Sequence, residues 1–66
     1  MKLNVNGEAR NFGALASLLE LVAELGLDAR KVAVERNLEI VPRSTLGDVR
    51  VENGDTYEIV HFVGGG

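Results

Sequence analysis

The sequence predicts an α+β fold in which one main helix covers one face of a mixed sheet of four to five strands. Several short runs alternate apolar and polar residues, with the two-residue period of half-buried strands. One stretch alone, residues 15–25, carries apolar residues at helical spacing. The 66 residues suffice for one small domain, and one helix packed on one sheet face can close its core.

The chain opens with a predicted β-hairpin. Residues 1–5 alternate in polarity, Asn6-Gly7 is the strongest short signal for a tight turn, and residues 8–12 form the return strand. A strict two-residue turn places Val5 opposite Glu8 on the same face, which would bury a charge. A bulge or a longer loop would avoid this, and the sequence leaves both open.

The helix is predicted over about residues 15–25, with Gly26 just past its end. Gly13 and Ala14 stand where Ser, Thr or Asp would cap a helix better, so we expect a frayed start. Leu21 is expected to flank the core. The expected core face consists of the regularly spaced apolar residues Leu15, Leu18, Leu19, Val22 and Leu25.

Two further strands follow the helix. Residues 31–35 alternate again, with Val32 and Val34 expected to point inward. Residues 39–41 form a short strand that ends at Pro42, because proline cannot donate a hydrogen bond to the ladder.

The next segment is predicted to contain two turns. Residues 44–48 form one short turn, which Ser44 can cap and from which Leu46 enters the core. Arg43 is interpreted as a solvated surface charge. Residues 53–55, Asn-Gly-Asp, make the second turn.

The last strand spans about residues 56–63. Because Glu58 should not be buried without a partner, its neighbours on the same face are also assigned to the outside. Val60 and Phe62 then form an exposed apolar patch, a candidate surface for binding a partner. The alternative is that Phe62 folds back over the rim of the core. The residues expected to face the helix are Tyr57, Ile59, His61 and Val63, with His61 partly covered at the rim.

The chain ends in Gly64, Gly65 and Gly66. Glycine gains nothing by packing and loses much backbone entropy when ordered, so we expect a domain of residues 1–63 followed by a flexible tail, residues 64–66. Extended, the tail would carry its carboxylate about 10 Å beyond the fold. That carboxylate is ionised at neutral pH and can attack an activated phosphate.

Composition narrows the possible functions. The net charge of −3, without a clustered basic face, argues against nucleic-acid binding. The chain has no cysteine and one histidine, so we expect no disulfide, no cysteine nucleophile, no multi-histidine metal site and no catalytic residues. With neither a signal peptide nor an apolar run of about 20 residues, it is expected to be cytoplasmic and not bound to a membrane.

The order of elements is that of a ubiquitin-like β-grasp fold, and the sequence resembles the ThiS-like sulfur carriers of thiamine biosynthesis. The matching runs are Lys2-Leu3-Asn4-Val5-Asn6-Gly7, Asn37-Leu38-Glu39-Ile40-Val41-Pro42-Arg43, Asn53-Gly54-Asp55 and Phe62-Val63-Gly64-Gly65-Gly66. The similarity spans nearly the whole chain. It departs from the family at Ala14, where Ser or Thr is usual, and in the third glycine, Gly64.

The resemblance implies a carrier protein and not an enzyme. A ubiquitin-activating-like adenylyltransferase would use ATP and Mg²⁺ to adenylate the Gly66 carboxylate. A sulfur donor such as a cysteine desulfurase would convert it to a thiocarboxylate, and thiazole synthase would take the sulfur. The domain itself would bind no cofactor, while Gly64 and Gly65, which lack side chains, would thread through narrow partner sites.

Two other functions remain open. One is a sulfur carrier like the small subunit of molybdopterin synthase, although Ile40-Val41-Pro42-Arg43 and the short length favour thiamine biosynthesis. The other is a β-grasp interaction domain that docks through Val60 and Phe62 and has an inert tail.

Overall fold

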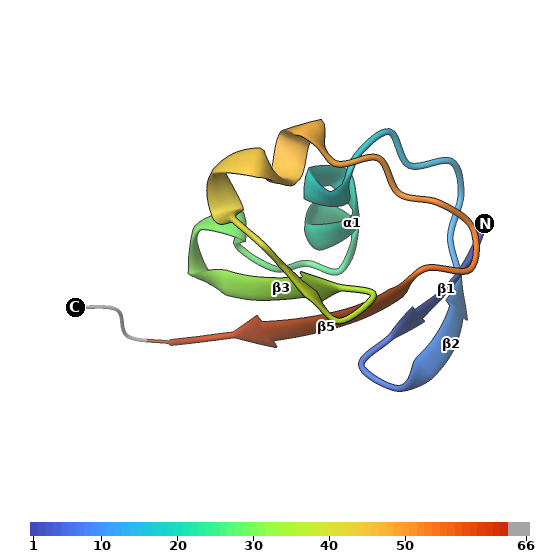
Figure 1. Ribbon diagram of the computed structural model, residues 1–66, viewed down its shortest axis with the longest axis horizontal. Coiled ribbons are helices and arrows are strands. Elements are labelled where there is room, and N and C mark those ends of the chain that lie inside the picture. Colours follow the sequence, from blue (N-terminus) through green and yellow to red (C-terminus); the bar gives the residue numbers. More distant parts are fainter. Residues whose placement is uncertain (64–66) are drawn as a thin grey trace.

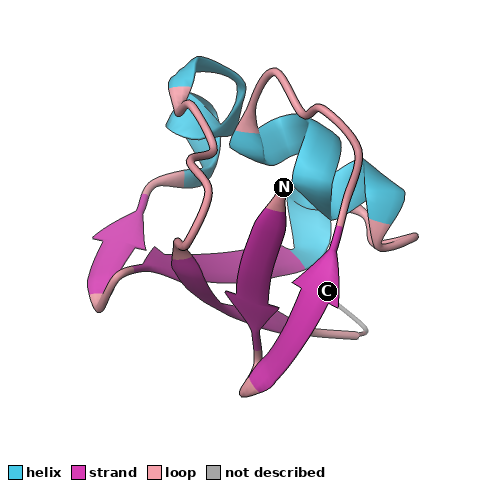
Figure 2. Ribbon diagram, turned by 90° about the vertical axis from the view of Figure 1, so that its right-hand side faces the viewer, coloured by secondary structure: helices cyan, strands magenta, loops and turns pink. Residues whose placement is uncertain are grey.

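The computed structural model describes residues 1–63, so the predicted tail lies outside the described residues. One sheet contains five strands, and the helical segments all lie over one of its faces (Figures 1 and 2). The strands are β1 (Lys2–Val5), β2 (Glu8–Asn11), β3 (Val32–Arg36), β4 (Glu39–Val41) and β5 (Thr56–His61). The helical segments are α1 (Leu18–Glu24) and the 3₁₀ helices η1 (Ala29–Lys31) and η2 (Arg43–Asp48). The predicted α+β class is confirmed.

The strand order β2-β1-β5-β3-β4 puts the first and last strands side by side in the middle of the sheet. β1 and β5 are parallel, whereas the other neighbouring strands are antiparallel. The side chain of Asn6 extends this central pairing: its Nδ2 donates to the Ile59 carbonyl at 3.1 Å, and its Oδ1 accepts from the Ile59 amide at 2.7 Å.

The core lies between the sheet and the helical layer. Its buried apolar residues are Leu3, Val5, Leu18, Leu21, Val22, Val32, Val34, Leu46, Val51, Tyr57 and Ile59. The inward positions predicted for β3 and for the start of β5 are confirmed, as is the burial of Leu46.

The first hairpin has the strict two-residue turn. Asn6 and Gly7 both have positive φ, 51° and 83°, and Val5 pairs with Glu8. Neither a bulge nor a longer loop is needed, because every residue of β2 is exposed. β2 is the edge strand, so Glu8 reaches water even though its cross-strand neighbour Val5 is buried.

The predicted start of the helix is wrong. α1 begins at Leu18, and the N-cap is Ser17, whose Oγ accepts from the Glu20 amide at 3.3 Å. The Glu20 carboxylate in turn accepts from the Ala16 amide at 3.3 Å. In a regular capping box this carboxylate would accept from the amide of the N-cap, Ser17, so the motif is shifted by one residue here. Leu15 precedes the helix and packs half-buried against the core.

The predicted core face of α1 is also partly wrong. Leu21 is fully buried, whereas Leu19 is 44% exposed. Successive helix positions are about 100° apart, so Leu18, Leu21 and Val22 share one arc and Leu19 falls outside it. The predicted end is confirmed: Gly26 has φ 77° and donates to the Ala23 carbonyl, while the Leu27 amide donates to that of Val22, the two bonds of a Schellman motif.

The short turn predicted over residues 44–48 is the 3₁₀ helix η2, which begins one residue earlier, at Arg43. The capping role of Ser44 is wrong, because Pro42 occupies the cap position without a side-chain bond. The Thr45 hydroxyl instead donates to the Pro42 carbonyl at 2.7 Å.

The end of β5 also differs from the prediction. His61 is exposed and not partly covered, and Val63 is 84% exposed and not turned toward the helix. The strand ends at His61, so the alternation of faces does not continue to Val63. Phe62 is 40% exposed and lies outside the core, which excludes the alternative that it covers the core rim.

Candidate functional site

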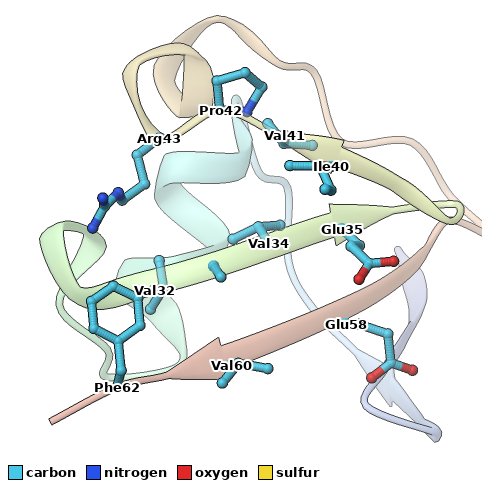
Figure 3. Close-up of a pocket in the computed structure, with 11 residues that line it drawn as sticks. Val32, Val34, Glu35, Ile40, Val41, Pro42, Arg43, Glu58, Val60 and Phe62 are labelled. Carbon is cyan, nitrogen blue, oxygen red and sulfur yellow. The ribbon is translucent and has the colours of Figure 1, made fainter.

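A shallow groove of about 330 Å³ lies on the sheet face opposite α1 (Figure 3). Strand alternation creates it: β3 sends Val32 and Val34 into the core, which leaves Ala33 on the outer face. Ala33 pairs with Val60 of β5, which lies on one side of β3, and Ile40 belongs to β4 on the other side of β3. Val60 is 61% and Ile40 80% exposed, so the apolar floor of the groove is open to solvent.

Phe62 and Arg43 form one end of the groove. The guanidinium carbon of Arg43 lies 5.4 Å from the centre of the Phe62 ring, within cation–π range. Nη1 of Arg43 also donates to the Arg30 carbonyl at 2.8 Å. The interpretation of Arg43 as a solvated charge is therefore incomplete, since the side chain is exposed but held by two contacts.

The other end of the groove is acidic. Glu35 and Glu58 are directly opposite each other on β3 and β5, and both are exposed (Figure 3). The ion pairs found within residues 1–63 involve neither of them. Like charges opposed across two strands are destabilising, so this pair costs the fold some stability. The groove thus has a positive charge at one end and two negative charges at the other.

The structure brings the predicted patch residues Val60 and Phe62 into this one groove. Sequence reasoning missed Ala33 and Ile40. Ile40 belongs to a strand of three residues, too short for alternation to assign its face. The candidate residues Gly64, Gly65 and Gly66 lie outside the described residues. The described part of the chain ends at Val63, the residue that follows Phe62.

A second polar cluster surrounds the buried side chain of Asp55. Its carboxylate accepts from Arg36 Nε at 3.0 Å, Tyr57 Oη at 2.8 Å, the Glu52 amide at 2.9 Å and Asn37 Nδ2 at 3.2 Å. Burial alone would raise the pKa of Asp55, but these hydrogen bonds outweigh it and hold the pKa below its ordinary value. Burial and the bond to Asp55 raise the pKa of Tyr57 well above its usual range. The cluster joins the end of β3 to the start of β5.

Within residues 1–63, no group of three or more His, Asp or Glu side chains is placed to hold a metal ion. In the same part of the chain, every helix is too short to cross a membrane.

Known proteins and one family model match most or all of the chain. A model described as the ThiS family matches residues 3–66. The chain is 61% identical over its full length to a thiazole synthase of Paramagnetospirillum magneticum and 47% to one of Magnetococcus marinus. It spans about a fifth of the length of these two relatives, 20% in each case. The sulfur carrier protein ThiS of Bacillus subtilis is 42% identical over 50 residues, 76% of each chain.

A solved structure agrees with the fold. The crystal structure of the thiamine biosynthesis protein (ThiS) from Geobacter metallireducens matches with a TM-score of 0.83 and 33% identity, over 100% of both chains. The ubiquitin-like β-grasp architecture expected from the sequence is thereby confirmed.

Proposed function

Because the chain belongs to the ThiS family, we propose that it is a sulfur carrier of thiamine biosynthesis whose Gly66 carboxylate becomes a thiocarboxylate. The observation that carries this proposal is the family match, which runs through the domain and continues to Gly66. The 42% identity to the Bacillus carrier supports it further, and favours it over a carrier of the molybdopterin-synthase type.

The chemistry needs two transfers at Gly66. A carboxylate oxygen attacks the α-phosphorus of ATP and pyrophosphate leaves, which gives an acyl-adenylate. A nucleophilic sulfur of the donor then attacks the acyl carbon and AMP leaves. Where the donor is a persulfide, a thiol reduces the remaining sulfur–sulfur bond and frees the thiocarboxylate. ATP and Mg²⁺ belong to the site of the adenylyltransferase, so the carrier needs a free carboxylate but no cofactor and no catalytic residue.

Partner enzymes would recognise the carrier through the domain of residues 1–63, and the groove is the surface that they would contact. Its exposed Val60, Ile40 and Phe62 offer apolar area on the outer face of the sheet. Phe62 stands at the groove end where the described chain leaves the sheet. We propose an adenylyltransferase, a sulfur donor such as a cysteine desulfurase, and thiazole synthase as partners. The two relatives named thiazole synthases, which contain a segment similar to this chain, support the last of these. The cytoplasm, where thiols stay reduced, is the proposed location.

Intact-mass spectrometry tests the carrier function. The chain is incubated with an adenylyltransferase that activates ThiS carriers, ATP and a sulfur donor. We expect a species heavier by the difference between a sulfur and an oxygen atom, with fragmentation placing the added mass on Gly66. If the same mixture modifies the Bacillus carrier but leaves this chain unchanged, the proposal is wrong.

Alanine variants of the tail separate a carrier from an interaction domain with an inert tail. Gly65→Ala and Gly66→Ala should leave the melting temperature unchanged, because the domain is predicted to end at residue 63. They should sharply lower ATP–pyrophosphate exchange, because the added methyl groups must enter a narrow site. Normal exchange by both variants would contradict the threading role of the glycines.

A further inference from the structure

Arg43 connects three segments at the groove end from which the chain leaves the sheet. It is the first residue of η2, its Nη1 donates to the Arg30 carbonyl in η1, and its guanidinium covers the ring of Phe62. We call the contact with the ring the Arg43–Phe62 clasp.

Phe62 is the point at which the chain leaves the fold. Its amide donates to the Lys31 carbonyl at 2.9 Å, which extends the β3–β5 pairing one residue past the end of β5. The next residue, Val63, is 84% exposed. Phe62 is therefore held on its backbone side by the sheet and on its ring side by Arg43.

We infer that Arg43 is a positioning residue, which fixes Phe62 and thereby the place from which the tail extends toward a partner's site. This inference rests on the carrier function proposed above. For a partner that binds only chains with Phe62 in place, the apparent affinity equals the intrinsic affinity multiplied by the fraction of such chains. Loss of the clasp should therefore raise KM for the carrier and leave kcat unchanged.

Arginine suits this role better than lysine. Its planar guanidinium can stack on an aromatic ring and still donate hydrogen bonds in its own plane. Arg43 makes both kinds of contact, since its guanidinium lies within cation–π range of the Phe62 ring while Nη1 donates to the Arg30 carbonyl. An ammonium group can attract the ring but cannot stack on it.

Hydrogen exchange of the Phe62 amide, followed by NMR, tests the inference directly. A cation–π contact at an exposed site corresponds to about a two- to fivefold change in an equilibrium. Arg43→Ala should therefore speed exchange of this amide about two- to fivefold, and Arg43→Lys should fall between. The matched control is Arg10→Ala, which removes a cation–π contact of 5.5 Å with Phe12 in another part of the fold. It should not change exchange at Phe62.

Steady-state kinetics with the adenylyltransferase give the second readout. Arg43→Ala should raise KM for the chain by the ratio of the fractions of native and variant chains that hold Phe62 in place, a factor no larger than the change in that equilibrium. Because Arg43 acts through Phe62, the double variant Arg43→Ala/Phe62→Leu should be no worse than Phe62→Leu alone.

Each other outcome has a definite meaning. Unchanged exchange at Phe62 overturns the clasp, and faster exchange with an unchanged KM overturns its role in positioning. Additive effects in the double variant would show that Arg43 contacts the partner itself, which also overturns the inference. A native chain that is not adenylated at all overturns the carrier function, whereas exchange at Phe62 still decides whether Arg43 holds the exit point.

Discussion

Among the single residues of the described chain, Asp55 has the side chain with the most hydrogen bonds. Its four donors come from the end of β3, the 52–55 turn and β5. A carboxylate stripped of water is unfavourable unless such donors replace the lost hydration. Asp55 therefore stabilises the fold only while it is ionised, and this makes its contribution depend on pH.

We predict that Asp55→Asn costs about 1.5–3 kcal/mol of unfolding free energy at pH 7, the range for hydrogen bonds to a charged group. The folded pKa of Asp55 lies below its ordinary value. Its contribution is thus complete above an unfolded pKa of about 3.9 and is lost as pH falls through the folded pKa. Urea unfolding from pH 7 to pH 2 should show the gap between native and variant chains closing only below about pH 4.

The control for this prediction is Glu39→Gln, which neutralises an exposed carboxylate outside the cluster. It should have little effect at any pH. A gap between native chain and Asp55→Asn that stays constant over the whole range would show that the carboxyl group does not titrate as the hydrogen bonds require.

At the scale of elements, α1 has only seven residues and would not persist alone. Ser17 caps its N-terminus, the Schellman motif at Gly26 caps its C-terminus, and one face of the helix packs on the sheet. We predict that Ser17→Ala destabilises the protein by about 1 kcal/mol, the usual loss for an N-cap. Ser44→Ala, in which the replaced serine caps nothing, is the matched control and should be nearly neutral. Equal urea midpoints for the two variants would refute the assigned cap.

β5 has one face for the core and one for the groove. Tyr57 and Ile59 are buried, while Val60 and, just past the end of the strand, Phe62 are exposed. We predict that Phe62→Ala weakens binding of the adenylyltransferase more than it lowers stability. A fully buried phenylalanine would cost about 3–5 kcal/mol on truncation, and Phe62 should cost clearly less. Calorimetric titration and thermal melting decide this, and a full core-sized loss of stability with unchanged binding would place Phe62 in the core.

At the scale of the whole molecule, the core is small enough for one side chain to matter. A domain of this length is expected to have about 3–10 kcal/mol of stability. We predict that Leu21→Ala, at a fully buried site, removes about 2–5 kcal/mol, which is a large share of that stability. Leu19→Ala, at a site that is 44% exposed, should cost about 1 kcal/mol. Equal losses in denaturant titrations would contradict the observed face of α1.

Much of this architecture could be predicted from local patterns, and the failures have physical causes. Alternation assigned Val32 and Tyr57 correctly, because a strand has only two faces. Helical spacing could not choose between Leu19 and Leu21, which flank the same apolar stripe. Packing of the helix against the sheet and η2 decides which of the two is buried. The direction of a long side chain such as Arg43 is set by partners distant in sequence. The groove could therefore be only half predicted.

The placement of β5 has a mechanical consequence. The strand that leads to the tail is hydrogen-bonded on both sides, to β1 and to β3, and the Asn6 side chain adds bonds at Ile59. A partner that draws the chain end into a channel pulls along the axis of this strand. The load is then shared in shear by both rows of hydrogen bonds and does not peel them apart singly. We expect the domain to resist this pulling force as one cooperative unit, so that a partner can draw in the end of the chain without unfolding the domain.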